Sequence, residues 1–301
     1  MNNDTRKKEK YGNRMMDLSI IIVSYNTADL IESCLNSVDK TDAGKEIFVV
    51  DNASNDGTAE IVRNHFPWVH LIVNEKNRGF ATANNQVLTD CHGRYILFLN
   101  PDTQIMADTL KNAISFMDDH PRIGLAGMKI INPDGTLQES VSYRYPGEKY
   151  TRGELSGLNG KIACVLGAGM IAGREIVLKT GGFDEDFFLY GEDQDLCLRI
   201  RKLGYEIGYI DDAVVTHLGG QSERQSTSAE KWGKKVRAEY LFYRKHYLPE
   251  TIARIRQDDL RKAHWRIATL KLTMPFVKDK TKAHEKLTKY EAINREAGYN
   301  I

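Results

Sequence analysis

Cysteine is scarce in this sequence, and its spacing excludes two classes of protein. Only four cysteines occur among the 301 residues, and none forms a CxxC pair or another metal-ligand spacing. A disulfide scaffold and a cysteine-based zinc site are therefore excluded. We expect small buried thiols in a protein of a reducing compartment. The four residues are Cys34, Cys91, Cys164 and Cys197.

Long apolar runs are absent as well. Two strongly apolar stretches, residues 18–23 and 162–171, fall well short of the roughly 20 residues that a membrane-spanning helix needs. No apolar segment follows the polar residues 1–17, so we expect no secretory signal. Hydrophobic residues still make up 41% of the chain and charged residues 28%, which excludes wholesale disorder. The composition indicates a folded, cytoplasmic protein.

The net charge of +1 is small, but the charge is unevenly distributed. Residues 223–301 contain 19 Lys and Arg against 10 Asp and Glu, whereas the preceding residues carry an acidic excess. A basic tail on an acidic body is typical of proteins that meet an extended anionic partner, such as a membrane surface or a nucleic acid. On charge alone, a solvated helical extension explains the tail equally well. No recognised nucleic-acid motif is present, so we do not expect a nucleic-acid partner.

The first 120 residues alternate between strand-like and helix-like patterns. Short apolar runs rich in β-branched residues predict buried strands at 18–24, 46–50, 69–73 and 95–99. Helical periodicity predicts helices between them at 29–38, 58–66 and 79–89. Strands separated by such helices form a parallel sheet with right-handed crossovers, which places the chain in the α/β class.

Beyond Pro121 the alternation becomes less regular. A turn is predicted at 132–136, and the segment 143–160 is rich in Gly and Tyr. Further elements are predicted as a buried strand at 162–171, a helix at 193–203 and a strand at 205–215. From about residue 229 the chain has a helical and basic pattern, in which Pro275 should interrupt any long helix.

Polar side chains follow three of the predicted strands. They are Ser24, Tyr25 and Asn26 after the first strand, Asp51 and Asn52 after the second, and Asn100 and Asp102 after the fourth. Open parallel sheets bind ligands at the carboxyl ends of their strands, so we expect these residues to share one edge. There Asp51 could accept a hydrogen bond from a nucleobase, and Asp102 could reach phosphates through a divalent metal. The alternative is that Asp51 and Asp56 only cap a turn and the next helix.

Two acidic clusters lie close together later in the chain. Asp184 and Glu185 stand beside Phe183, and Glu192 and Asp193 follow Tyr190. Carboxylates bracketed by aromatic rings suit a sugar site, because the rings stack on C–H faces and the carboxylates accept hydroxyl hydrogen bonds. The alternative is that Glu192 or Asp193 only caps the start of a helix.

Taken in order, seven segments resemble the family 2 inverting glycosyltransferases, which adopt the GT-A fold. The segments are SIIIVSYN (19–26), VVDNASNDGT (49–58), NRGFA (77–81), LNPD (99–102), GAGM (167–170), GGFDE (181–185) and YGEDQDLCLR (190–199). The resemblance covers roughly residues 18–220. Residues 100–102, together with YRKH at 243–246, resemble the rhamnosyltransferase-like branch of that family.

The resemblance implies how a sugar would be transferred. The acidic motif before a helix supplies the base that deprotonates the acceptor hydroxyl, which maps onto Asp193, with Glu192 as the rival. A single displacement then inverts the anomeric carbon without a covalent nucleophile. The resemblance places two further segments beside the sugar or the acceptor. They are the glycine-containing segment with Gly169 and Met170 and the acidic segment with Asp184 and Glu185.

The resemblance also implies a nucleoside diphosphate sugar as donor. Asp51 maps onto the residue that accepts the imide N–H of uracil or thymine, so UDP- and dTDP-sugars are expected alike. The turn Ser24, Tyr25 and Asn26 would frame the base or ribose, with Asn52 and Asn100 as further nucleotide contacts. Arg78, just before a predicted helix, would contact the diphosphate with help from the helix amides. The alternative for Arg78 is an ordinary surface arginine.

A divalent metal is implied beside the diphosphate. Asp102 matches the second aspartate of the D-x-D motif of the family, but Asn100 replaces the first. With one anionic ligand fewer, the metal should depend on the diphosphate oxygens. His217 follows a predicted strand where some relatives place another ligand, and an imidazole would shift the preference from Mg²⁺ toward Mn²⁺. The alternative for His217 is a structural histidine.

These inferences predict three parts of the chain. Residues 1–17 form a polar N-terminus, residues 18–222 a GT-A-like catalytic domain and residues 223–301 a helical basic extension. Within the catalytic domain, 18–120 is the nucleotide-binding half and 121–222 the half for sugar and acceptor. The mixed basic and apolar extension is expected to lie on the cytoplasmic face of a membrane, which would suit a lipid-linked saccharide acceptor. The alternative is a helical appendage that packs on the catalytic domain or forms a homodimer.

The predicted function is transfer of a sugar, with rhamnose as one option, in the synthesis of a cell-surface polysaccharide or glycolipid. Two other functions fit the sequence less well. A nucleotidyltransferase would need a basic, glycine-rich loop after the first strand, and residues 24–27 do not form one. A non-catalytic sugar- or nucleotide-binding module would be expected to have lost Asp102 or Asp193, and both are present.

Overall fold

The computed structural model describes residues 16–41, 43–219 and 226–298, and these fall into two compact units. The sheet unit comprises Met1–Tyr143, Asn159–Phe188 and Asp193–Ser222, as far as those ranges are described. The helical unit comprises Arg144–Leu158, Leu189–Glu192 and Glu223–Ile301, with the same restriction. The predicted N-terminal part up to residue 15 and the predicted boundary at 222/223 lie outside the described residues.

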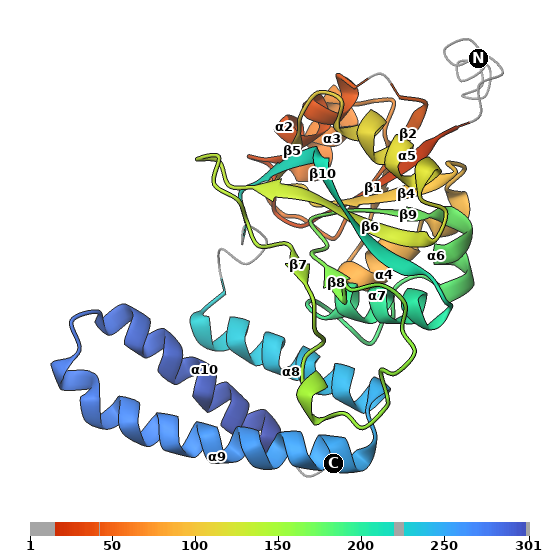
Figure 1. Cartoon of the computed structure of the whole chain (residues 1–301). Helices are drawn as coiled ribbons and strands as arrows, with labels where there is room; N and C mark the ends of the chain where they lie inside the picture. The colour runs from red at the N-terminus through yellow and green to blue at the C-terminus, as the bar shows by residue number, and fades with distance from the viewer. Residues whose placement is uncertain (1–15, 42, 220–225, 299–301) are drawn as a thin grey trace. The chain divides into compact units, whose positions relative to one another are not determined.

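The sheet unit is built on an eight-stranded sheet with the order β3-β2-β1-β4-β9-β6-β10-β5 (Figure 1). Strands β1, β2, β3, β4, β6 and β10 run in one direction, and β9 and β5 run against them. The strands are β1 (Leu18–Ser24), β2 (Lys45–Asp51), β3 (His70–Val73), β4 (Tyr95–Leu99), β5 (Thr103–Ile105), β6 (Ile123–Ile131), β9 (Gly169–Gly173) and β10 (Glu206–His217). This mostly parallel sheet flanked by helices confirms the predicted α/β, GT-A-like class.

Helices cover the sheet through apolar stripes that the sequence periodicity predicts. In α2 (Ile31–Asp39) the buried residues are spaced at helical intervals, at Ile31, Cys34, Leu35 and Val38. They join α3 (Thr58–His65), α5 (Thr109–Asp119) and alternate residues of β1 in one apolar cluster, because side chains on a strand point alternately to its two faces. Helices α4 (Phe80–Asn85) and α6 (Arg174–Thr180) pack against β1 and β9 respectively, and α7 spans Glu192–Lys202.

Two predicted elements are wrong in their extent. The apolar run 162–171 is not one strand but two, β8 (Cys164–Val165) and β9, because the main chain leaves the extended ladder at 166–168. There Leu166 N bonds Ser140 O at 2.8 Å and Asn100 N bonds Ala168 O at 3.1 Å. The predicted helix 79–89 is a six-residue α4 followed by a 3₁₀ turn, Leu88–Asp90. Strand β8 pairs with β7 (Val141–Ser142) in a separate two-stranded sheet.

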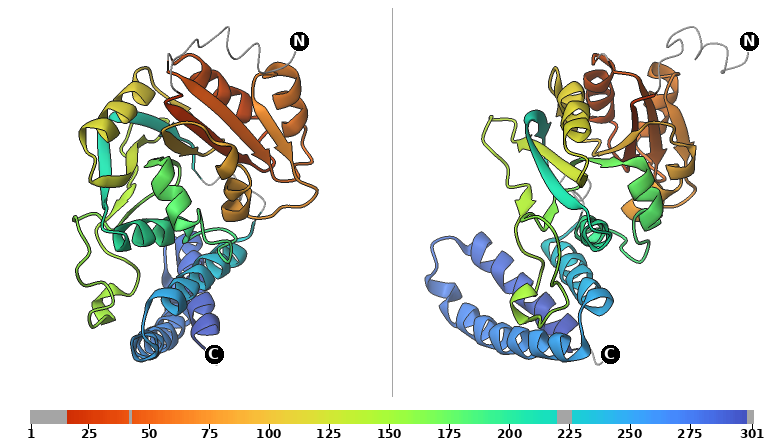
Figure 2. Two further views of the ribbon diagram at one scale, coloured as in Figure 1. Left: turned by 90° about the vertical axis from the view of Figure 1, so that its right-hand side faces the viewer. Right: turned by 45° about the vertical axis from the view of Figure 1, so that its right-hand side comes forward.

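The helical unit contains three long helices, α8 (Ser228–His246), α9 (Pro249–Thr273) and α10 (Lys280–Gly298), shown from two further sides in Figure 2. Helix α8 begins with a capping box between Thr227 and Glu230, and α9 ends just before Pro275 as predicted. A short 3₁₀ turn, Met274–Phe276, links α9 to the segment before α10, and another, Glu148–Tyr150, packs on α9. No helix among the described residues is long and apolar enough to cross a membrane.

Candidate functional site at the carboxyl edge of the sheet

The carboxyl ends of β1, β2 and β4 meet at one edge of the sheet. In the parallel register, Ser24 at the end of β1 is level with Asp51 at the end of β2. On the other side of β1, Ile22 is level with Leu99, the last residue of β4. The prediction that the three polar strand ends share one edge is therefore confirmed.

Asp51 is fully buried in the turn that follows β2. Its Oδ1 accepts hydrogen bonds from Ser24 Oγ at 3.1 Å and Ser54 Oγ at 2.6 Å, and its Oδ2 accepts one from Ser54 N at 3.0 Å. The carboxylate thus organises the turn, which is the structural alternative raised for it above. A direct contact with a nucleobase stays a prediction.

The turn after β1 is tied to the turn after β2. Asn26 adopts a positive φ of 52°, a conformation that Asn tolerates better than most residues. Its N–H donates to Ser54 Oγ at 2.8 Å, and its Oδ1 accepts from Asn55 N at 2.9 Å. Tyr25 precedes it and is partly exposed. These contacts hold the two turns together at the edge where a nucleotide is expected.

Asp56 takes the capping role that the sequence suggested as an alternative. Its Oδ1 accepts from Thr58 N at 3.1 Å at the start of α3, and its Oδ2 accepts from Ala28 N at 2.9 Å. Although burial alone would raise the pKa of Asp56, the hydrogen bonds from Thr58 and Ala28 hold that pKa below its ordinary value. Asp56 therefore stays ionised and stabilises the turn.

Asn52 fixes the loop that carries Arg78. Its Nδ2 donates to Gly79 O at 3.1 Å, and its Oδ1 accepts from Arg78 N at 3.1 Å. Gly79 has a φ of +84°, and a Cβ there would lie 2.6 Å from Phe188 O, so glycine is required. The first amide of α4, Phe80 N, already bonds Phe188 O at 2.9 Å, so it is not available to a diphosphate. The exposed Arg78 guanidinium has no ion pair with another described residue.

Asp102 and His217 are brought together although they are 115 positions apart. Strand β5 pairs antiparallel with β10, which places His217 opposite Thr103 and beside Asp102. His217 Nε2 lies 3.3 Å from Asp102 Oδ1, and both residues are buried, with 7% and 3% exposed. On the other side of the ring, His217 Nδ1 lies 2.8 Å from Gln138 Oε1.

The hydrogen bond to Gln138 determines what the imidazole presents to Asp102. An amide oxygen is an acceptor, so Nδ1 carries a proton, and Nε2 faces Asp102 either as a lone pair or as a second N–H. Asp102 Oδ1 in turn has no hydrogen-bond partner among the described residues. A buried carboxylate oxygen opposite a ring nitrogen is stabilised by a cation between the two atoms, which is either a proton on the ring or a metal.

The spacing of these two atoms fits metal ligation. Two ligands at about 2.1 Å from one octahedral ion and at right angles to each other are about 3.0 Å apart, close to the observed Nε2–Oδ1 distance. Among the described residues, no group of three or more His, Cys, Asp or Glu side chains could hold a metal. A metal at Asp102 and His217 would therefore need further ligands from water and diphosphate. Asn100 directly follows β4, stands two positions before Asp102 in the sequence and is partly exposed.

Asp193 lies near the start of α7 and is connected to the same edge. Its Oδ2 accepts from Gly167 N at 3.3 Å, and its Oδ1 accepts from Gln194 N at 2.8 Å. The next residue, Ala168, bonds Asn100 N at the end of β4. Burial raises the pKa of Asp193, against the opposing effect of the two backbone amides. A raised pKa makes a carboxylate a stronger general base.

Glu192, the rival base, is the first residue of α7 and is 8% exposed. It belongs to the helical unit, whereas Asp193 belongs to the sheet unit. Its assignment stays a prediction.

The predicted sugar residues fall into two groups. Glu185 is tied to α4, because its Oε1 accepts from Asn85 Nδ2 at 3.0 Å and its Oε2 from Thr82 Oγ1 at 3.1 Å. Asp184 accepts from Asp186 N at 3.1 Å within its own turn. Gly169 and Met170 are buried in β9, and the Met170 side chain is 0% exposed. A sugar contact by any of the four stays a prediction.

Sequence reasoning missed one residue that contacts His217 and one that fixes helix α7. Gln138 orients His217, and no sequence signal singles it out, because it lies after β6, 79 positions before His217, and the two meet only in the tertiary structure. Arg199 donates from Nε to Asp195 Oδ2 at 2.7 Å and from its guanidinium to Thr180 O at 2.9 Å and Gly182 O at 2.8 Å. The i, i+4 spacing of Asp195 and Arg199 on a helix was the available signal for that pair.

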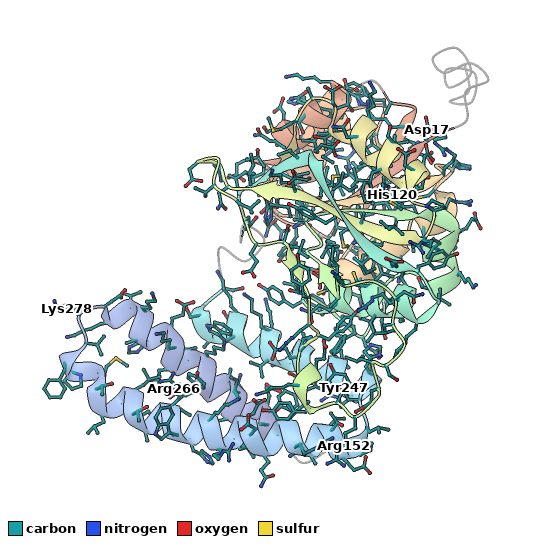
Figure 3. All side chains as sticks on the ribbon, in the orientation of Figure 1. Asp17, His120, Arg152, Tyr247, Arg266 and Lys278 are labelled. Carbon is teal, nitrogen blue, oxygen red and sulfur yellow. The ribbon has the colours of Figure 1, made fainter. Side chains whose placement is uncertain are left out.

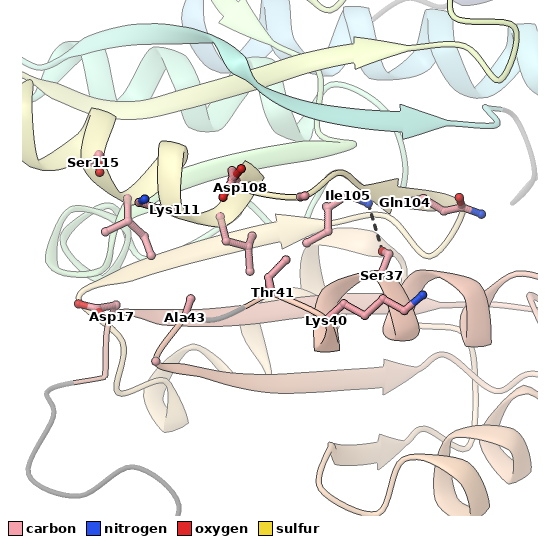
Figure 4. A pocket seen from close by; sticks show the side chains of 14 residues that line it. Asp17, Ser37, Lys40, Thr41, Ala43, Gln104, Ile105, Asp108, Lys111 and Ser115 are labelled. Carbon is pink, nitrogen blue, oxygen red and sulfur yellow. Dashed lines mark hydrogen bonds between the residues drawn. The ribbon is translucent and has the colours of Figure 1, made fainter.

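A cavity of about 880 Å³ lies elsewhere in the sheet unit, lined by parts of α2, β5 and α5 (Figure 4). Lys40, Lys111 and Asp108 line it, and Ile105 N donates to Ser37 Oγ at 3.1 Å beside it. None of the predicted site residues lines this cavity. Its size therefore does not identify the functional site.

This chain is similar to known proteins in both sequence and fold. The sequence profile described as Glycosyl transferase family 2 matches residues 19–180, more than half of the chain. An N-acetylglucosaminyl-diphospho-decaprenol L-rhamnosyltransferase of Mycobacterium tuberculosis is 25% identical over 231 residues, covering 66% of this chain and 75% of that relative. A poly(ribitol-phosphate) beta-N-acetylglucosaminyltransferase, TarS, of Staphylococcus aureus is 33% identical over 159 residues, covering 50% of this chain and 26% of TarS.

Solved structures share the fold. The mannosyltransferase PcManGT from Pyrobaculum calidifontis, in complex with GDP-Man and Mn²⁺, matches with a TM-score of 0.60 at 20% identity, covering 96% of this chain and 90% of that one. Residues 1–349 of S. aureus TarS in complex with UDP-GlcNAc match with a TM-score of 0.54 at 22% identity, covering 94% and 83%. At these identities the likeness shows the fold alone.

Proposed function

The chain belongs to glycosyl transferase family 2 and is a glycosyltransferase, and we propose that it moves a sugar, with inversion, from a nucleoside diphosphate sugar to a hydroxyl of a saccharide acceptor. The observation that carries the metal-dependent part of this proposal is the buried pair Asp102 and His217, whose Oδ1 and Nε2 atoms are 3.3 Å apart. A Mn²⁺ or Mg²⁺ ion there would neutralise the departing diphosphate. Within the part of the chain that the structure describes, no group of three His, Cys, Asp or Glu side chains could hold a metal, which fits an ion that binds together with its nucleotide.

In this proposal Asp193 accepts the proton of the attacking hydroxyl. Its raised pKa suits that role, and the backbone amides of Gly167 and Gln194 keep the carboxylate oriented. The turns after β1 and β2 would receive the nucleotide. They are built by Ser24, Tyr25, Asn26, Asp51 and Asn52. The exposed Arg78 would approach the diphosphate from the loop that Asn52 holds.

We propose a cell-surface glycan as the product. The relatives' names point to lipid-linked and polymeric acceptors, namely N-acetylglucosaminyl-diphospho-decaprenol and poly(ribitol-phosphate). Rhamnose from a dTDP-sugar is the first donor to test, because the M. tuberculosis relative is named a rhamnosyltransferase.

Calorimetric titration with UDP, dTDP and GDP, each with and without Mn²⁺, tests the donor site. The proposal expects one nucleotide to bind with an affinity that rises at least tenfold when Mn²⁺ is added. GDP is included because a structural neighbour carries GDP-Man. If a folded sample binds none of the three nucleotides, the proposed donor site is wrong.

We further propose that the helical unit lies on an anionic membrane surface at the cytoplasmic face. Leu272 at the end of α9 and Phe276 in the following 3₁₀ turn have 76% and 86% of their surface exposed, and Figure 3 labels the nearby Lys278. Lys271 and Lys280 flank these apolar side chains and are also exposed. Each lysine near an anionic leaflet contributes about 1 kcal/mol, and the apolar side chains add burial.

Co-sedimentation with vesicles tests this surface. We expect binding to vesicles that contain phosphatidylglycerol, weak binding to pure phosphatidylcholine, and several-fold weaker binding by Leu272→Ser. Leu137→Ser is the matched control, because Leu137 is 64% exposed in the sheet unit. Equal binding by both leucine variants would contradict the assignment. Homodimerisation through the extension stays a prediction.

A further inference from the structure

The turn that carries Asp102 lies between β4 and β5 and ends at Thr103, the first residue of β5. Thr103 is 1% exposed and belongs, like Asp102 and His217, to the sheet unit. We propose that Thr103 is a positioning residue of the metal site, whose hydroxyl holds this turn so that Asp102 faces His217 before an ion binds. The inference rests on the proposed function, because it concerns the ion assigned there to the diphosphate.

The Thr103 hydroxyl closes the turn. Thr103 Oγ1 donates to Asn100 O at 2.6 Å, so this hydrogen bond spans Pro101 and Asp102. The proline ring fixes φ at Pro101, which already restricts one of the two residues inside the turn. Asn100 N donates to Ala168 O at 3.1 Å and so anchors the start of the turn. The main chain is therefore restrained on both sides of Asp102.

Cys34 packs behind the same carbonyl. Its Sγ lies 3.6 Å from Asn100 O and 3.8 Å from Thr103 Oγ1, and the Cys34 side chain on α2 is 0% exposed. A thiol is a weak hydrogen-bond donor, so the hydroxyl makes the stronger of the two bonds to Asn100 O. The Thr103 hydroxyl is thus the side-chain group that chiefly holds this carbonyl.

Thr103 is also connected to the second metal residue. It stands opposite His217 in the antiparallel register between β5 and β10. Beside this pair, Leu218 N donates to Asp102 O at 3.0 Å. The main chain of Thr103 therefore aligns β5 with His217, while its hydroxyl fixes the turn that carries Asp102.

The carboxylate of Asp102 is held less firmly than its main chain. Its Oδ1 has no hydrogen-bond partner among the described residues and lies 3.3 Å from His217 Nε2. A buried carboxylate oxygen gains free energy by turning toward any donor within reach, so a looser turn would let it move away from His217. Ligands that are fixed in advance bind an ion more tightly, because less conformational freedom is lost on binding.

Thr109 offers a matched control for a purely structural role. It is 0% exposed, and its Oγ1 likewise donates to a main-chain carbonyl, Val214 O, at 2.9 Å. This hydrogen bond lies outside the turn that carries Asp102. Loss of a hydroxyl that only stabilises the fold lowers the melting temperature and leaves the metal affinity of the folded protein unchanged. Loss of a positioning hydroxyl lowers both quantities.

Calorimetric titration of the full chain tests the inference, with whichever of UDP, dTDP and GDP the wild type binds most tightly, with and without Mn²⁺. Thr103→Val removes the hydroxyl and keeps the branched shape of the side chain. We expect the Mn²⁺-dependent part of the affinity to fall about fivefold, as for one lost neutral hydrogen bond, and the affinity without Mn²⁺ to stay within about twofold.

Three further variants complete the test. Thr103→Ser retains the hydroxyl and should restore the wild-type Mn²⁺ dependence. Thr103→Ala lacks the hydroxyl and should show at least the loss of Thr103→Val, which gives a second measurement where the valine variant does not fold. Thr109→Val should lower the melting temperature about as much as Thr103→Val and leave the Mn²⁺ dependence unchanged.

The inference is overturned if folded Thr103→Val keeps the wild-type Mn²⁺ dependence, if Thr103→Ser loses as much as Thr103→Val, or if Thr109→Val loses as much. In each of these cases the wild type still binds its nucleotide with Mn²⁺, so the proposed function stands. A wild type whose nucleotide affinity does not respond to Mn²⁺ gives a different result, because the proposed metal site is then wrong and this inference fails with it.

Discussion

Two buried aspartates at the same edge of the sheet differ in how their oxygens are satisfied. Asp51 accepts three hydrogen bonds from Ser24 and Ser54 and has no exposed surface. Asp102 is almost as buried, but its Oδ1 has no hydrogen-bond partner among the described residues and lies 3.3 Å from His217 Nε2. A carboxylate whose partners all come from the fold stabilises that fold, whereas a buried carboxylate oxygen without such a partner indicates a ligand. Sequence position alone does not separate these two cases.

Asp193 is a third carboxylate to compare with Asp51 and Asp102, and its substitution has the largest expected effect on activity. Asp193→Asn should lower transfer by about 10²- to 10⁴-fold, because an amide cannot accept the acceptor proton. Nucleotide affinity should remain within about twofold of wild type, as measured by calorimetry beside a transfer assay. Asp119→Asn, on an exposed residue at the end of α5, is the control. Normal turnover by Asp193→Asn would remove it as the base.

The pH dependence of the transfer rate also tests the role of Asp193 as the base. Burial raises the folded-state pKa of Asp193, so the proton is held to a higher pH than in the unfolded chain. The rate should therefore fall as the pH decreases through that raised pKa. Charging this carboxyl in the folded state costs stability, so the wild type should gain stability relative to Asp193→Asn as the pH decreases through the raised pKa. A difference in melting temperature between the two proteins that does not change with pH would contradict this sign.

Asp102→Asn should remove most of the Mn²⁺-dependent part of nucleotide affinity, a loss on the order of 100-fold. The amide lacks the charge that a hard divalent cation prefers, and the ligand set is already small. Affinity measured without Mn²⁺ should hardly change, which separates a lost ligand from a damaged fold. An unchanged Mn²⁺-dependent affinity would contradict the role of Asp102.

Gln138→Leu should lower the Mn²⁺-dependent part of nucleotide affinity by about 10-fold, which is a smaller loss than that expected for Asp102→Asn. The substitution removes the acceptor that fixes the proton on His217 Nδ1 while retaining a similar volume. Calorimetry with and without Mn²⁺ checks it, and Gln138→Glu should restore part of the loss because it again offers an acceptor. If Gln138→Leu binds Mn²⁺ and nucleotide as wild type does, the orienting role is excluded.

Asp51→Asn should act mainly on stability, by about 1–3 kcal/mol. The Nδ2 donor of an Asn would face the Ser54 N–H or the hydroxyls that Asp51 now accepts, leaving buried groups unpaired. Denaturant unfolding at pH 7 measures the change, again with Asp119→Asn as control. A variant with wild-type stability would place Asp51 outside the structural role assigned here.

The fold was predictable where local pattern and burial agree. Residues 18–24 and 95–99 form strands with the expected bounds, because both are short apolar runs buried on each side. The run 162–171 was not predictable, because the break at 166–168 depends on bonds to Ser140 and Asn100 that are distant in sequence. The hydrophobicity of a segment indicates that its residues are buried. To form a strand, the segment also needs a neighbouring strand with which it can hydrogen-bond in register.

The candidate site likewise has features that the sequence predicts and features that depend on tertiary contacts. The resemblance singled out Asp102 and His217, but the register between β5 and β10 and the pairing with Gln138 come only from tertiary structure. Helix α4 is shorter than its periodicity suggests, and one of the amides expected to assist Arg78, Phe80 N, bonds Phe188 O.

Electron paramagnetic resonance of Mn²⁺, titrated into the protein at a saturating concentration of the nucleotide that binds best, tests the central claim most directly. The account predicts that Mn²⁺ binds tightly only when the nucleotide is present, and that Asp102→Asn and His217→Gln each weaken it strongly while Asp119→Asn does not. Wild-type Mn²⁺ affinity in both Asp102→Asn and His217→Gln would contradict the account, because the facing pair would then hold a proton and not a metal.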